Sequence, residues 1–233
     1  MLRRSFAITS VLLAVAAPAS AEPPTGSRLG DRAIQGLQYT EEQADEAGTR
    51  LASCMAAKRE RFARDYMAAK TATQQDKAQG PLFRQLSCLG FSNLSDMSDT
   101  SVVSMPPDIL RGKIAEALLK GDRDKIAALA ALPLAKDYAR PWFAATGRDP
   151  VIDEMGACVA DTNPRGIASV LSTRGYSKEE GAAFGALSPS LGPCLRVGAK
   201  LQANRPALRA ALADALYQRL QAPPAAAATV GTN

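Results

Sequence analysis

Apolar side chains recur every three or four residues along much of the chain, the spacing that places them on one face of an α-helix. From Thr40 to Tyr66 this stripe predicts one long helix, which carries Cys54. Residues 40–43 (TEEQ) have the form of a capping box, in which the threonine and glutamine side chains satisfy amides at the helix start. No segment shows the apolar and polar alternation of a strand, so the sequence predicts an all-α fold.

Further helices are predicted downstream by the same periodicity. The next is expected to begin at Thr73 and to run toward Cys88, and residues 91–105, rich in serine, threonine and aspartate, are expected to form a loop. A proline pair then precedes a helix with an apolar residue at every fourth position, which Gly121 ends before a short continuation toward Leu132.

The second half of the chain has its own helix-start residues. Asp149 is followed by a proline at the first helical position, and Asn163-Pro164 is expected to interrupt a helix that is continuous in the first half. Residues 177–180 (SKEE) form a second capping box, and the last helix is expected to begin near Pro206.

The two halves carry the same features in the same order, which predicts an internal duplication. In each half a cysteine precedes a hydroxyl-x-x-carboxylate tetrad by nineteen residues, a second cysteine follows, and a similar phrase closes the unit. The pairs are Cys54 and Cys158, Thr73–Asp76 and Ser177–Glu180, Cys88 and Cys194, and LRGKIAEAL (110–118) and LRAALADAL (208–216). The first unit is eight residues longer between its second cysteine and its closing phrase, within residues 89–109.

The duplication predicts both the disulfides and the domain layout. Because a repeated unit most simply carries its own crosslink, we expect Cys54 to pair with Cys88 and Cys158 with Cys194, ahead of the two cross-repeat pairings and of free thiols. The expected fold is two tandem disulfide-stapled helical units, packed as one bundle-like globule through their closing helices. The predicted segments are 1–21 (signal peptide), 22–39 (disordered lead-in), 40–133 (unit 1), 134–148 (connector), 149–221 (unit 2) and 222–233 (disordered tail).

The N-terminus is typical of export. Arg3 and Arg4 precede a short apolar run and the small-residue motif at 19–21, so the mature chain is expected to begin at Glu22; the general and twin-arginine routes both stay open. The run is too short to span a membrane. Removing residues 1–21 leaves 26 basic against 23 acidic residues, so the net charge falls from +5 to +3 and gives no support for nucleic-acid binding. We expect a soluble periplasmic or secreted protein.

The sequence predicts no catalytic, cofactor-binding or metal-binding residues. The chain has no histidine, which excludes Ser-His-Asp and Cys-His catalysis and the usual His-based metal sites. The carboxylates of most interest are Glu116 and Asp214, at equivalent positions of the closing phrases. With Arg111 and Arg209, five residues earlier in each copy, they are expected to form helix-surface ion pairs or to link the units; the alternative is a catalytic carboxylate pair.

Residues 58–64 contain the one dense basic run. Phe62 falls on the apolar stripe and Glu60 is placed to pair with Arg64, so a solvated helix face is favoured over a nucleic-acid surface. Likewise, the aromatic cluster around Trp142 in the connector is interpreted as packing between the units.

The closing phrase at 110–118, the cysteines upstream and their copies resemble an uncharacterised group of exported bacterial proteins whose units end in a similar phrase. The resemblance covers residues 40–220 and implies export and helical repetition, with no known activity. We expect an interaction protein that binds an unknown protein or other envelope partner, in the groove between the units or on the loop at 91–105. The alternatives are a carboxylate-based envelope hydrolase acting on cell-wall glycans and a structural or stress-related envelope protein; the oligomeric state stays open.

Overall fold

The structure is a computed structural model that describes residues 40–84, 88, 105–196, 198–199, 201 and 203–222. Within these ranges the chain forms nine α-helices, with 310 helices at Pro141–Ala145 (η3) and Gly192–Cys194 (η4), and no strand, so the all-α prediction is confirmed. The α-helices are α1 Glu41–Lys58, α2 Glu60–Met67, α3 Ala72–Phe83, α4 Pro107–Leu119, α5 Arg123–Ala128, α6 Pro150–Thr162, α7 Pro164–Leu171, α8 Lys178–Leu191 and α9 Arg205–Gln221.

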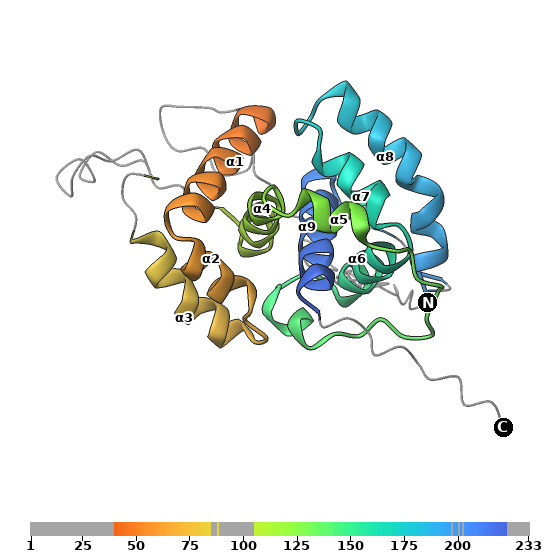
Figure 1. The fold of residues 1–233 in the computed structure, drawn as a ribbon, viewed down its shortest axis with the longest axis horizontal. Coiled ribbons are helices and arrows are strands. Elements are labelled where there is room, and N and C mark those ends of the chain that lie inside the picture. The colour runs from red at the N-terminus through yellow and green to blue at the C-terminus, as the bar shows by residue number, and fades with distance from the viewer. Residues whose placement is uncertain are drawn as a thin grey trace, which may run out of the picture.

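Helices α4 and α9, which carry the two closing phrases, pack against each other at the centre of the molecule (Figure 1). Helices α1 to α3 lie on one side of this pair and α6 to α8 on the other. Helix α4 also packs against α1 and α2, and α9 against α6 and α7, so each central helix contacts both halves. The expected packing of the closing helices is therefore present, and it joins the halves into one globule.

The apolar residues that predicted the two central helices lie in the core. Leu110, Ile114, Leu212 and Leu216 are at most 1% exposed, and one continuous cluster of buried apolar side chains includes residues from both halves. Four-residue spacing alone produces one apolar face, but α4 and α9 are buried almost all round because they have helices on several sides. This is why even their charged residues are buried.

Side-chain caps fix most of the predicted helix starts. Thr40, Asp149 and Ser177 accept backbone amide hydrogens as expected, and Asn204 caps α9 in the same way. The predicted start at Thr73 is wrong by two residues. Thr71 is the cap of α3, where its hydroxyl accepts a hydrogen bond from the Gln74 amide at 3.2 Å, so the cap lies one residue before the helix begins at Ala72.

The prediction of one unbroken helix from Thr40 to Tyr66 is also wrong. The chain leaves helical geometry at Arg59 (φ −134°, ψ 37°), between α1 and α2. The second half has a break at the equivalent position, Asn163, with similar angles (φ −143°, ψ 61°). Both halves therefore have an interrupted first helix, and the Asn163-Pro164 motif does not mark a difference between them. The Arg59 guanidinium donates to the Pro81 carbonyl at 2.9 Å, a tertiary contact that helps hold a break for which the sequence has no proline.

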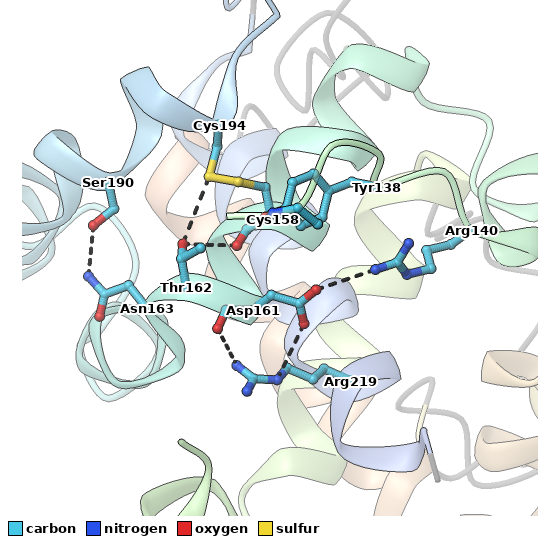
Figure 2. The surroundings of a disulfide bond; sticks show 10 residues. Tyr138, Arg140, Cys158, Asp161, Thr162, Asn163, Ser190, Cys194 and Arg219 are labelled. Carbon is cyan, nitrogen blue, oxygen red and sulfur yellow. Dashed lines mark hydrogen bonds and ion pairs between the residues drawn. A yellow bond between two sulfur atoms is a disulfide. The ribbon is translucent and has the colours of Figure 1, made fainter. Parts of the chain in front are cut away.

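Disulfides join Cys54 to Cys88 and Cys158 to Cys194, the pairs that the sequence analysis favoured. Figure 2 shows the second disulfide, where the Thr162 hydroxyl donates to the Cys158 carbonyl at 2.9 Å and lies 3.9 Å from the Cys194 sulfur. Each bond connects the first helix of its half with the segment after the third. It thereby closes a loop whose ends are 34 or 36 residues apart in sequence.

The connector between the halves has no regular secondary structure and is mostly exposed before η3, which packs near α3. Trp142 is buried and contacts Phe143 edge to face, as expected for packing. Helix α5 ends at Ala128, short of the predicted continuation, and Leu132 is 43% exposed. The predicted signal peptide, lead-in, tail and most of residues 89–109 lie outside the described residues.

Candidate functional site

The central helices approach closely where Gly112 faces Ala210. A Cβ atom built on Gly112 would lie 2.3 Å from both Cα and Cβ of Ala210 and 2.7 Å from its carbonyl oxygen. These two residues occupy the same position in the two closing phrases, LRG and LRA. The close contact therefore requires glycine on at least one of the two helices.

Each closing phrase supplies an arginine that pairs with the carboxylate of the other phrase. Arg111 Nε lies 2.7 Å from Asp214 Oδ2, and Arg209 binds both oxygens of Glu116, with Nη2 to Oε1 at 2.8 Å and Nε to Oε2 at 3.0 Å. All four side chains are buried. Of the two structural roles considered from sequence, the ion pairs therefore link the halves.

Both arginines also bind the end of a helix in their own half. Arg111 donates to the carbonyls of Tyr66 and Met67 at the end of α2. Arg209 donates to those of Val170, Leu171 and Thr173 at the end of α7. Carbonyls at a helix C-terminus lack partners within the helix, so a buried guanidinium satisfies them. A side chain of the following helix completes each set: Gln75 Oε1 lies 3.1 Å from Arg111, and Glu180 Oε1 lies 2.9 Å from Arg209.

These contacts account for the two carboxylates that the sequence analysis considered for catalysis. Asp214 is fully buried and also pairs with Arg148, whereas Glu116 reaches the edge of a cleft but is bound by Arg209. The hydrolase hypothesis therefore loses its best candidate pair. Within the described ranges, no group of three or more cysteine, aspartate or glutamate side chains is placed to hold a metal ion.

The two buried aspartates beside Arg148 differ in their electrostatics. Burial by itself would raise the pKa of Asp214, but the charges of Arg111 and Arg148 outweigh it and hold the pKa below its ordinary value. At Asp153, burial raises the pKa above its ordinary value and outweighs the opposing effects of the Arg148 charge and of the hydrogen bond that the Thr146 hydroxyl donates at 2.5 Å. Of these two aspartates, Asp214 is therefore the one whose ionisation is favoured by folding.

Acid is expected to remove this contribution of Asp214. Because its folded pKa lies below the unfolded value of about 3.9, ionised Asp214 stabilises the fold above about pH 4, and the effect is lost as pH falls through the folded pKa. Urea unfolding measured from pH 6 downward should therefore show a steeper loss of stability for the wild type than for Asp214→Asn. Parallel curves for the two proteins would contradict this assignment.

A cleft of about 720 Å³ opens between the two halves, on the side of α4 and α9 covered by α1, α5 and α7. Its lining comes from five helices and the turn that follows α7. The lining residues are Glu42, Asp45, Glu46, Thr49, Lys113, Glu116, Leu119, Lys120, Arg123, Ile126, Ala127, Arg165, Ala168, Leu171, Ser172, Thr173, Arg174, Gly175, Arg209 and Leu216.

Buried ion pairs fix part of the cleft wall. Lys113 Nζ lies 2.6 Å from Asp45 Oδ1 and 2.8 Å from the Thr49 hydroxyl, which joins α4 to α1, and the Arg209–Glu116 pair joins α9 to α4. The lining also has an apolar part, which includes the buried side chains of Leu119, Ile126 and Leu216. The wall of the cleft thus combines side chains held by ion pairs with apolar ones.

The turn between α7 and α8 lines the cleft and contacts α1. Arg174 lies 3.1 Å from Glu42, and a Cβ atom on Gly175 would meet the Asp45 carboxylate at 2.3 Å. Tyr176 has a positive φ of 62°, which is rare for a residue other than glycine, and its amide donates to Glu180 at 2.8 Å. Strained residues of this kind are enriched at ligand-binding and switch regions.

The cleft contains residues that the sequence analysis did not select. Lys113 stands where the second closing phrase has Ala211, and this difference between the two phrases was the signal that could have found it. No such signal marks Lys120, Arg123 and Arg165. These three residues line the same cleft only because of how α4, α5 and α7 pack. Residues 91–104, in the loop considered as an alternative binding surface, lie outside the described residues.

No protein-family model matches the sequence, and no curated protein or solved structure is significantly similar to it. The resemblance to uncharacterised exported proteins and the origin by duplication therefore stay predictions. None of the helices in the described part of the chain has the length and apolar character needed to cross a membrane.

Proposed function

We propose that this protein is an exported binding protein that holds a ligand in the cleft between its two halves. The observation that carries the proposal is the cleft itself, whose volume of about 720 Å³ falls within the range of about 300 to 1,000 Å³ of small-molecule sites. Such sites combine an apolar lining with a few fixed polar groups, as this lining does. Two disulfides support action in an oxidising compartment, the periplasm or the exterior of the cell.

The architecture around the cleft favours binding over catalysis. Of the four acidic residues in the lining, Glu42, Asp45 and Glu116 pair with lining cations, and Glu46 pairs with Arg50 at 2.8 Å. A general acid or base must exchange protons with a substrate, and carboxylates held by arginine or lysine are poorly suited to this role. A preformed wall also lowers the entropy lost on binding, because its side chains are already ordered.

Two neighbouring alanines on α5 provide a matched test. Both are exposed, but Ala127 lines the cleft and Ala128 does not. Small molecules extracted from the cell envelope should raise the melting temperature of the wild type and of Ala128→Trp, by about 5 to 10 °C at a ligand concentration near 100 times Kd. Ala127→Trp should abolish the shift because the indole fills the cleft.

Native mass spectrometry of the same mixtures should detect a bound mass in the wild type and Ala128→Trp alone. Equal shifts for the two tryptophan variants would place the ligand elsewhere on the protein. The absence of a shift and of a bound mass in all three proteins would contradict the proposal.

A further inference from the structure

The lining of the cleft has an excess of positive charge. It contains six lysine or arginine side chains and four acidic ones. Arg174, Lys113 and Arg209 pair with acidic residues of the lining. Within the part of the chain that the structure describes, the three remaining cations have no carboxylate within 4.0 Å: Lys120, Arg123 and Arg165.

These three side chains are exposed and have few polar contacts. Lys120 Nζ lies 3.5 Å from the Ser53 hydroxyl, and Arg165 Nη2 lies 3.3 Å from the Ala127 carbonyl. Arg123 makes no hydrogen bond or ion pair with any described residue. Guanidinium groups bind the two oxygens of a carboxylate in parallel, so Arg123 and Arg165 suit an oxyanion better than a neutral polar group.

The lining also has an apolar part. Leu119, Ile126 and Leu216 are buried under it, and Ala168 and Leu171 are half-buried in its wall. A small inorganic anion would leave this apolar surface in contact with water. An alkyl chain attached to the anion would remove it from water, which is favourable in proportion to the area covered.

We propose that the ligand is a single-chain anionic amphiphile, whose carboxylate binds Lys120, Arg123 and Arg165 while its alkyl chain lies on the apolar part of the lining. This inference rests on the proposed function, because it names the ligand class of the same cleft. The charge complementarity excludes cationic amphiphiles. The apolar lining distinguishes the ligand from a free phosphate or an acidic peptide.

Calorimetric titration of the oxidised protein with alkyl carboxylates provides the test. Decanoate, below its micelle concentration, should bind more tightly than octanoate, by up to about fourfold for each added methylene. Decyltrimethylammonium, inorganic phosphate and a glutamate hexapeptide should show no binding at the same concentrations. Decanoate affinity should also fall as sodium chloride is raised from about 50 mM to about 500 mM, because salt screens the exposed cations.

Variants of the cationic residues locate the head group. Arg123→Gln and Arg165→Gln should each weaken decanoate binding by about threefold to tenfold, the loss expected for a charged hydrogen bond near solvent. Arg61→Gln is the matched control, since Arg61 is an exposed arginine on α2 away from the cleft. It should bind decanoate like the wild type. Ala127→Trp should abolish binding and Ala128→Trp should preserve it.

The outcomes separate the ligand class from the proposed function. If phosphate or the acidic peptide binds as tightly as decanoate, the assignment of the ligand as an anionic amphiphile is wrong. The same holds if Arg123→Gln and Arg165→Gln leave the decanoate affinity unchanged. If the envelope extract shifts the wild type and not Ala127→Trp while decanoate fails to bind, the cleft is a binding site and the ligand class alone is wrong. Decanoate binding retained by Ala127→Trp would overturn the assignment of the site.

Discussion

Replacing Arg209 by glutamine is expected to lower the free energy of unfolding by about 3 to 5 kcal/mol, the range for removing one partner of a buried ion pair. Arg209 holds two carboxylates, those of Glu116 and Glu180, which are 7% and 1% exposed. Without the guanidinium, Glu116 has no cation within 4 Å among the described residues. Glu180 keeps the hydrogen bond from the Tyr176 amide, but its nearest described cation is Arg205, at 3.7 Å. The carbonyls at the end of α7 lose their donor as well.

Guanidinium chloride unfolding of the oxidised protein measures this effect. Arg196→Gln is the control, because the Arg196 side chain is 67% exposed and its pair with Glu154 should contribute no more than about 1 kcal/mol. In the Arg209→Gln background, Glu116→Gln should be less destabilising than in the wild type, since the two side chains form one pair. A loss for Arg209→Gln as small as that for Arg196→Gln would show that the pair does not hold the halves together.

Gly112→Ala is expected to destabilise the protein by about 3 kcal/mol or more, at the upper end of overpacking effects, because the new methyl group meets backbone atoms of α9. On an exposed helix the same change is stabilising by about 1 kcal/mol, since alanine has the higher helix propensity. A loss of stability in place of this gain therefore identifies the close contact between the central helices. Gly185→Ala on α8 is the matched control, as nothing lies within 4 Å of its added Cβ.

The same unfolding experiment can distinguish backbone from side-chain contact. Adding Ala210→Gly to Gly112→Ala should recover a minor part of the loss, because the Cα and carbonyl oxygen of residue 210 remain in place. Full recovery would mean that only the two methyl groups conflict. A stabilising effect of Gly112→Ala similar to that of Gly185→Ala would rule out the close packing of α4 on α9.

Most of the helices could be predicted from local sequence because their signals are local. Capping residues such as Thr40 and Ser177 act within one turn, and apolar residues at every fourth position mark the buried face of α4 and α9. The break at Arg59 could not be predicted in this way. It has neither proline nor glycine, and its side chain contacts Pro81 on another helix, so its cause lies far away in sequence.

The candidate site likewise has a part that could be predicted from the sequence and a part that could not. The sequence singled out Arg111, Arg209, Glu116 and Asp214, and it left open whether they pair on one helix surface or between units. Residues five apart on a helix are poorly placed to meet, so the crossed pairing follows from the packing of α4 on α9. The cleft cations were missed because Lys120, Arg123 and Arg165 resemble any other exposed basic residues until α4, α5 and α7 are placed together.

The sequence by itself determined the all-helical fold and most of the helix starts, because hydrophobic periodicity and capping depend on neighbours within a few residues. Only the tertiary structure decided which charges are buried and that each of the two arginines crosses to the other half. It also decided that a cleft lies between the halves, with three lining cations that pair with no carboxylate of the described residues. These features arise from contacts between residues far apart in the sequence, such as Arg111 and Asp214, which are 103 positions apart, and no local pattern predicts which of them will meet.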